Sequence, residues 1–296
     1  MNIAVVDIGS NTVKMKIYSV NNGILNEIFS EVNNAKLISY ISSGVLSDKG
    51  IFLLCNIINS FKSKAKENNA DIFSCFATAS LRRTNNINEI KNTVLDFCGE
   101  KIDLVSGNDE AFYSFSGVKN TMPNFPDNAI LIDMGGGSTE VVHCLLGQKK
   151  ESESMNFGSL SLYLDYPQNN FDAMKNFAVQ SFEKTKLFPL NVTDAVLVGG
   201  TALALNKIYT HFYTDSPEYS MTYNNLKNMY EKLRSYDENV INLLTELVPH
   251  RVTTVIPGLA AYLGLFEIAS VKNITVSTCG IREGYVYEKI LKSLES

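Results

Sequence analysis

The chain has 296 residues, of which 45% are hydrophobic and 19% are charged, so it can form two domains of average size with filled cores. Its 26 basic against 31 acidic residues give a net charge of −5, which argues against sequence-independent binding to DNA. Five widely spaced cysteines and three isolated histidines argue against a disulfide framework and a zinc site, and indicate reduced thiols in a cytoplasmic protein.

The first third of the sequence predicts a strand meander followed by alternating helices and strands. Its start, "MNIAVVDIGSN", lacks the basic region of a signal peptide. Residues 3–7 and 13–20 are β-rich runs, and "NNG" at 21–23 is a turn signal before another extended run. From residue 47 the pattern predicts a helix with Ser47 as its N-cap, then a strand (71–80), a helix (86–100) and a strand (101–107).

The pattern restarts near residue 129. The segment "AILIDMGGGSTEVVHCLLGQ" repeats the design of "IAVVDIGSNTVKMKIYSVNNG", with an apolar strand ending in Asp, a glycine turn and a second strand. Asp133 follows Asp7 by 126 residues, and Gly135 follows Gly9 by the same interval. An internal duplication of domain size explains this spacing.

The remainder predicts a helical stretch at 171–187, a strand at 194–200, a helix at 201–209, a helical region at 222–248, and a last strand and helix from residue 274. The apolar stretch at 257–270 contains Pro257 and Glu267, which favours a buried helix and no membrane span. Two prolines at 121–129 mark a boundary. We therefore expect a first lobe at 1–122, with the helix 284–296 packing back on it, and a second lobe at 123–283.

Three glycine-bearing turns follow apolar strands, at 7–12, 133–139 and 198–202. Without Cβ atoms, successive backbone N–H groups can point at one anion, and phosphate is the natural ligand. The alternative is that each is only a tight turn. The candidate phosphate-binding residues are Gly9, Ser10, Asn11, Gly135, Gly136, Gly137, Ser138, Thr139, Gly199, Gly200 and Thr201.

Three carboxylates, Asp7, Asp133 and Glu140, lie next to these turns. A bare carboxylate would repel bound phosphate unless a cation lay between them. Mg²⁺ can bind one or two carboxylates together with phosphate oxygens, and so removes this repulsion. These three residues are therefore candidate metal ligands. Their alternative roles are hydrogen bonding to the turn backbone for the aspartates and a solvated strand position for Glu140.

The glycine turns resemble those of the actin, Hsp70 and sugar-kinase superfamily. More closely, the chain resembles the exopolyphosphatase/guanosine-pentaphosphate phosphatase (Ppx/GppA) family in its short form, through "AVVDIGSNTVKMKI", "FATASLRRTNN", "LVSGNDEAFYSFSGV", "LIDMGGGSTEVV", "VGGTALALNKI", "VIPGLAAYLGL" and "ITVSTCGIREGYV". The resemblance implies an α/β fold of two ribonuclease-H-like, actin-like ATPase lobes, with mixed sheets flanked by helices and a cleft between the lobes.

The resemblance also assigns roles. Glu110 matches the catalytic glutamate that activates water, although Ser106 with Asp109 or Glu110 also matches a helix-capping pair. Arg82 matches the family's phosphate-binding arginine, Asp133 and Glu140 match its essential acidic pair, and Ser138 matches its phosphate-loop hydroxyl. The sequence departs from the family where Lys14 and Ser161 replace arginine and Thr253 replaces aspartate, which leaves substrate chain length and nucleotide recognition open.

The expected function is Mg²⁺-dependent release of terminal phosphate from inorganic polyphosphate or guanosine pentaphosphate. Glu110, Arg82, Asp133 and Glu140 are the expected catalytic residues. Two alternatives remain: a sensor that binds a guanosine alarmone or nucleotide with little turnover, and a small-molecule kinase of the same superfamily. We expect no DNA or membrane partner, and a homodimer is compatible with the sequence.

Overall fold

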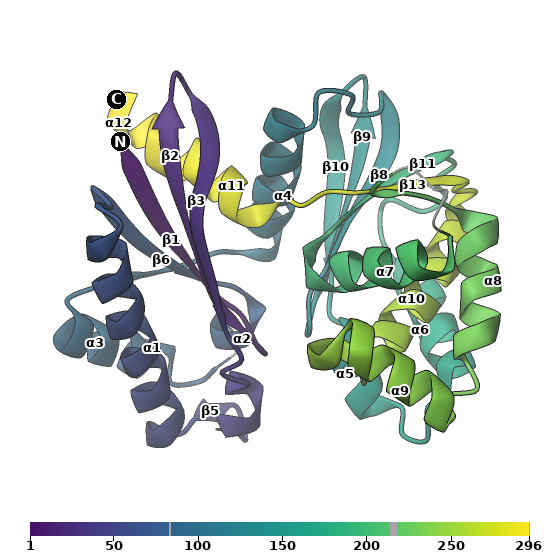
Figure 1. The fold of residues 1–296 in the computed structure, drawn as a ribbon, viewed down its shortest axis with the longest axis horizontal. Helices are drawn as coiled ribbons and strands as arrows, with labels where there is room; N and C mark the ends of the chain where they lie inside the picture. The colour runs from purple at the N-terminus through teal and green to yellow at the C-terminus, as the bar shows by residue number, and fades with distance from the viewer. Residues whose placement is uncertain (83, 214–217, 296) are drawn as a thin grey trace. The chain divides into compact units, whose positions relative to one another are not determined.

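Each copy of the repeated sequence pattern folds into a meander of three antiparallel strands. Further strands, parallel to the first strand of the meander, continue the same sheet. The computed structural model describes residues 1–82, 84–213 and 218–295 (Figure 1). The chain divides into unit 1, Met1–Glu110 with Tyr285–Ser296, and unit 2, Ala111–Gly284. The division falls inside helix α4 (Gly107–Thr121), whose first turn belongs to unit 1, whereas the sequence pattern suggests a boundary after residue 122. Each unit is a mixed sheet flanked by helices, which confirms the predicted α/β class.

Unit 1 contains a five-stranded sheet in the order β3-β2-β1-β6-β7. Strands β2 and β3 continue antiparallel from β1, and β6 and β7 run parallel to it. The strands are β1 (Asn2–Ile8), β2 (Val13–Asn21), β3 (Ile24–Asn33), β6 (Ile72–Ala77) and β7 (Ile102–Leu104), with a separate short pair, β4 (Ile41–Ser42) and β5 (Val45–Leu46). The helices are η1 (Leu37–Tyr40), α1 (Asp48–Glu67), α2 (Ala79–Arg82), α3 (Ile87–Cys98), and the C-terminal η3 (Val286–Leu291) and α12 (Lys292–Glu295).

Helices cover both faces of the unit 1 sheet. Helix α1 begins as predicted, because the Ser47 side chain accepts a hydrogen bond from the Gly50 N–H. Its buried side chains and those of α3 pack with every second residue of β1 and β2 in one core. On the opposite face, Tyr285 packs against Phe76 with the ring centroids 4.7 Å apart and the ring planes tilted by 30°, and it donates a hydrogen bond to Asp103 at 2.7 Å.

Unit 2 contains a six-stranded sheet in the order β10-β9-β8-β11-β13-β12. Its strands are β8 (Asn128–Met134), β9 (Thr139–Leu145), β10 (Gln148–Met155), β11 (Asp194–Val198), β12 (Ser220–Thr222) and β13 (Asn273–Val276). Its helices, besides most of α4, are α5 (Ser159–Asp165), α6 (Phe171–Glu183), α7 (Gly199–Phe212), α8 (Tyr223–Leu233), α9 (Glu238–Leu247), η2 (Pro249–Arg251), α10 (Val255–Ala269) and α11 (Ile281–Tyr285).

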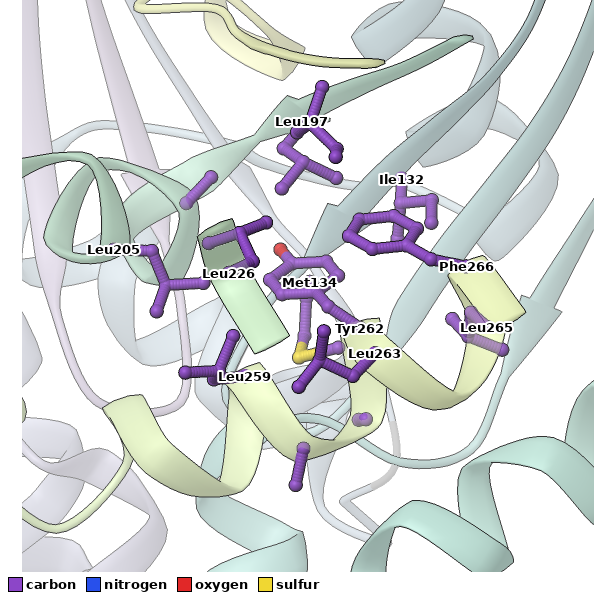
Figure 2. Packing of buried hydrophobic residues seen from close by; sticks show 14 of the residues in the cluster. Ile132, Met134, Leu197, Leu205, Leu226, Leu259, Tyr262, Leu263, Leu265 and Phe266 are labelled. Carbon is purple, nitrogen blue, oxygen red and sulfur yellow. The ribbon is translucent and has the colours of Figure 1, made fainter. Parts of the chain in front are cut away.

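Helix α10 is the centre of the larger unit 2 core. Nearly all of its side chains are buried, which confirms the predicted buried helix, although the helix begins two residues earlier than expected. Figure 2 shows Leu259, Tyr262 and Phe266 of α10 beside Ile132 and Met134 of β8. Helix α4 covers the opposite sheet face with a smaller core. Within the described ranges, no helix combines the length and apolar character needed to cross a membrane.

The structure confirms the internal duplication. In unit 1, β1 and β2 pair so that Asp7 lies opposite Lys14, and in unit 2, β8 and β9 pair so that Asp133 lies opposite Glu140. Both pairs of positions differ by the same 126 residues. Five strands follow the same order in both sheets, a meander and then two parallel strands on the other side of the first strand, and unit 2 adds the antiparallel edge strand β12.

The predicted helical region at 222–248 is two helices. Helix α8 ends at Leu233, Tyr236 adopts a left-handed backbone conformation with φ of 48°, and Asp237 accepts the N–H of Val240 at 3.1 Å to cap α9. Tyrosine is an unusual residue in that conformation, so the sequence carried little signal for the break. The short helix α5 and strand β12 were also not predicted.

Candidate functional site

In unit 1, the turn between β1 and β2 is fixed by its own backbone. The Gly9 N–H donates to the Thr12 carbonyl at 3.0 Å and closes the turn. The carbonyls of Ser10 and Asn11 accept the N–H groups of Ile38 and Lys36 at 3.0 and 2.8 Å. The predicted phosphate-binding residues 9–11 therefore form one rigid, half-buried loop at the end of β1.

Two further segments end at the same edge of the unit 1 sheet. Strands β1, β6 and β7 are parallel, so their carboxyl ends lie together. Arg82 lies in α2, after β6, and Glu110 lies in the first turn of α4, after β7. The fold therefore brings both predicted catalytic residues of unit 1 to the edge that carries the Gly9 turn.

Arg82 and Glu110 form an ion pair that sequence reasoning did not predict. Arg82 Nη1 contacts Glu110 Oε1 and also donates to the Val105 carbonyl. The Glu110 side chain is only 6% exposed. The nearby guanidinium offsets the cost of burying this carboxylate.

The structure decides which acidic residue caps α4. The Ser106 hydroxyl accepts the Asp109 N–H at 3.1 Å and donates to the Asp109 carboxylate at 2.6 Å. The sequence left Asp109 and Glu110 as alternatives for this role. Asp109 takes it, and Glu110 is turned toward Arg82.

In unit 2, the triple-glycine turn repeats the closure of the first turn. The Gly135 N–H donates to the Ser138 carbonyl at 3.0 Å, as Gly9 does to Thr12. Backbone N–H groups at the start of α5 hold this turn: that of Ser159 donates to the Gly135 carbonyl at 3.0 Å, and that of Ser161 donates to the Gly136 carbonyl at 2.9 Å. The turn is thus held in place by a neighbouring helix N-terminus.

Ser161, which departs from the family's arginine, has a structural role here. Its hydroxyl accepts the Gly158 N–H at 2.9 Å and so satisfies a backbone donor at the start of α5. The hydroxyls of Thr139 and Thr201 also serve the fold: Thr139 donates to the Phe157 carbonyl at 2.7 Å, and Thr201 donates to Ser159 at 3.1 Å. Both threonines are fully buried, so these two predicted phosphate ligands use their side chains inside unit 2.

Asp133 and Glu140 face each other across neighbouring strands. They are direct partners in the β8–β9 register, so their side chains leave the same sheet face a few ångströms apart. Glu140 is 3% exposed and accepts a hydrogen bond from Ser154 at 2.9 Å. Asp133 accepts one from Ser114 at 2.5 Å.

This pair fits a hard divalent cation. Like charges directly opposite each other in a sheet are destabilising, and a cation bound to both carboxylates would relieve the repulsion. Mg²⁺ commonly takes one or two protein carboxylates and completes its shell with water and phosphate oxygens. Among the described residues, no group of three or more His, Cys, Asp or Glu side chains forms a full protein-only metal site. Asp7 belongs to unit 1 and occupies the position equivalent to Asp133.

The third glycine turn joins β11 to α7 beside Asp133. Gly199 has a φ of 92°, and a Cβ there would lie 2.8 Å from Asp133 Oδ1, so backbone and contact both require glycine. Gly200 packs against the guanidinium of Arg251. Burial lowers the pKa of Arg251 from its very high ordinary value. Sequence reasoning missed this cation, because an isolated arginine between Pro249 and a buried helix has no distinguishing pattern.

Comparisons with known proteins agree with this architecture. The model of the Ppx/GppA phosphatase family matches residues 16–293. The guanosine-5'-triphosphate,3'-diphosphate pyrophosphatase of Photobacterium profundum is 24% identical over 98% of the chain, and the chain spans 59% of that relative's length.

Two solved structures show the same fold. The Ppx/GppA family member from Aquifex aeolicus is 22% identical with a TM-score of 0.84, covering 100% of this chain and 99% of that one. An exopolyphosphatase from Cytophaga hutchinsonii is 18% identical with a TM-score of 0.86, covering 97% of each chain. Because the family model matches almost the whole sequence, the chain belongs to the Ppx/GppA phosphatase family.

Proposed function

We propose that the protein is a phosphoanhydride hydrolase that releases terminal phosphate from inorganic polyphosphate or guanosine pentaphosphate. The observation that carries the proposal is the opposed pair Asp133 and Glu140 beside the closed glycine turn of unit 2. Family membership supports it, as do the relative named as a guanosine pentaphosphate pyrophosphatase and the neighbour named as an exopolyphosphatase.

In unit 2, the proposed task is to hold phosphate and its counter-ion. The Gly135 N–H closes the turn, so the backbone N–H groups of residues 136–138 would bind phosphate oxygens. Arg251 beside Gly200 would add positive charge at the third turn. Asp133 and Glu140 would hold Mg²⁺, which offsets the negative charge of the phosphoryl group when bound. Such transfers depend mainly on positioning and electrostatics, which rigid turns supply.

In unit 1, the proposed task is to activate water. Glu110 would accept a proton from the water that attacks the terminal phosphorus, while the bond from that phosphorus to the bridging oxygen breaks. The shortened polyphosphate or nucleotide leaves with the bridging oxygen, and the terminal phosphoryl group with the water oxygen becomes inorganic phosphate. Arg82 would keep the Glu110 carboxylate oriented through their ion pair and contact phosphate oxygens with its remaining N–H groups. The Gly9 turn would contact phosphate through its backbone.

The test replaces Glu110 with Gln and measures phosphate release with Mg²⁺ from tripolyphosphate, long polyphosphate and guanosine pentaphosphate in parallel. The control is Glu246→Gln, which changes an exposed glutamate of α9. We expect Glu110→Gln to lower the rate roughly 10²–10⁴-fold, the usual contribution of a general base, and the control to behave as wild type. Near-normal turnover by folded Glu110→Gln would refute the role of Glu110.

The same assays separate hydrolysis from sensing. A hydrolase releases phosphate from at least one of the three substrates. A sensor would show a rise in melting temperature with guanosine pentaphosphate but no phosphate release, and that result would overturn the proposed activity.

A further inference from the structure

The face of α4 that packs on the unit 2 sheet contains one polar position. Ala111, Ser114, Phe115 and Val118 follow the three- and four-residue spacing of a helix face. Three of them join the small core with Leu131, Val142 and other sheet residues. Ser114 is fully buried, although serine is mostly an exposed residue.

The Ser114 hydroxyl reaches Asp133. It donates to Oδ2 at 2.5 Å, which is short for a neutral donor and typical of a hydroxyl bound to a carboxylate. The other oxygen, Oδ1, lies against Gly199, where a Cβ would come within 2.8 Å. The carboxylate is therefore held from two directions, by a helix hydroxyl and by the glycine turn.

Glu140 is held in a similar way from a third element. Ser154 lies directly opposite Glu140 in the β9–β10 register and donates to Oε1 at 2.9 Å. The row Asp133, Glu140 and Ser154 thus crosses three neighbouring strands on one sheet face. Ser114 adds the bond that comes from outside the sheet, and α4 packs on that same face.

We propose that Ser114 is a positioning residue for Asp133, which it fixes in the orientation that lets Asp133 and Glu140 bind one divalent cation together. The inference rests on the proposed function, since it takes Asp133 to be a metal ligand. Hydrogen bonds to metal-binding carboxylates orient them before the metal arrives, and their loss typically weakens metal affinity 10–100-fold. A purely structural serine would affect stability and leave metal affinity unchanged.

The experiment measures Mn²⁺ binding to the full chain by electron paramagnetic resonance, with no substrate present. Ser114→Ala removes the hydroxyl. Ser114→Thr and Ser114→Val introduce side chains of similar volume, of which threonine keeps a hydroxyl and valine lacks one. Ser116→Ala is the matched control, because Ser116 is a buried serine of the same helix whose hydroxyl accepts a bond from Asn120. Urea unfolding of each variant establishes that it is folded.

We expect Ser114→Ala and Ser114→Val to bind Mn²⁺ roughly 10–100-fold more weakly, and Ser114→Thr and Ser116→Ala to bind within about threefold of wild type. In an Asp133→Asn background, Ser114→Ala should have no further effect, since the bond acts through Asp133. Wild-type affinity in Ser114→Ala, with affinity lost in Asp133→Asn, overturns the role of Ser114 alone. Wild-type affinity in Asp133→Asn overturns the metal role of Asp133, and with it the basis of the inference.

Discussion

Replacing Gly158 with alanine places a methyl group against the backbone of the triple-glycine turn. The added Cβ would lie 2.5 Å from the Gly135 oxygen, 2.6 Å from the Gly136 carbonyl carbon and 2.7 Å from the Gly137 nitrogen. Favourable carbon contacts lie near 3.5–4.0 Å, so the turn must withdraw by about 1 Å. All three atoms belong to the backbone and cannot move aside as a flexible side chain can.

The magnitude follows from two opposing effects. Forcing extra volume into a packed site costs about 1–3 kcal/mol. Gly158 has extended backbone with φ of −147°, which alanine adopts freely. Alanine also lowers the conformational entropy of the unfolded chain, which stabilises the folded protein by about 0.4–1 kcal/mol. We expect Gly158→Ala to lower the free energy of unfolding by about 1–2 kcal/mol and to abolish most phosphate release by displacing the turn.

Gly136→Ala is the informative partner. Its Cβ would meet Leu160 at 3.5 and 4.0 Å, which is ordinary van der Waals contact, and its φ is outside the left-handed region. We expect its stability to equal that of wild type or exceed it by up to about 1 kcal/mol, and its phosphate release to stay near that of wild type, because the added methyl group points to Leu160 and leaves the turn in place.

Urea unfolding and phosphate release from tripolyphosphate, measured on both variants, check these expectations. A Gly158→Ala variant as stable as wild type would refute the steric reasoning. A loss of phosphate release in Gly136→Ala as large as that in Gly158→Ala would contradict the view that Gly158→Ala acts by displacing the turn.

Arg82→Lys should lower kcat/KM for polyphosphate roughly 10–100-fold, because lysine keeps the charge but cannot reproduce both bonds of Arg82 Nη1, each charged hydrogen bond being worth about 1.5–3 kcal/mol; an unchanged kcat/KM would contradict this role. Native protein at pH 8 should react with Ellman's reagent at Cys279 only, because the other four thiols are buried. Burial raises the pKa of Cys55 and Cys144 to about 12 and also raises the pKa values of Cys75 and Cys98. Labelling of any thiol other than Cys279 in the folded protein would contradict this prediction. The raised pKa values of Cys55 and Cys144 predict a stability loss above about pH 9, because these thiols ionise there in the unfolded chain but stay protonated up to about pH 12 in the folded one. The urea midpoint of Cys144→Ala should therefore fall less between pH 8 and 10 than that of wild type.

The sequence by itself determined the repeated architecture. Strands β1 and β2 and their counterparts β8 and β9 were predictable because apolar runs ending in Asp and followed by glycine turns are local signals. The 126-residue interval then implied an internal duplication, and the pairs Asp7–Lys14 and Asp133–Glu140 show that the two hairpins share one register. Ser47 at the start of α1 was likewise readable, since a cap acts over three residues.

The contacts around the candidate site depended on the tertiary structure. No local pattern pairs Arg82 with Glu110, places Arg251 against Gly200, or directs Ser114 toward Asp133. Local patterns also could not show that the Thr139 and Thr201 hydroxyls point inward. Sequence periodicity records which face of an element is buried, whereas the partner that each buried polar group meets depends on how distant segments are brought together. The sequence alone therefore gave the turns and their acidic residues, and only the packing of α2, α4 and α7 decided which side chains hold them in place.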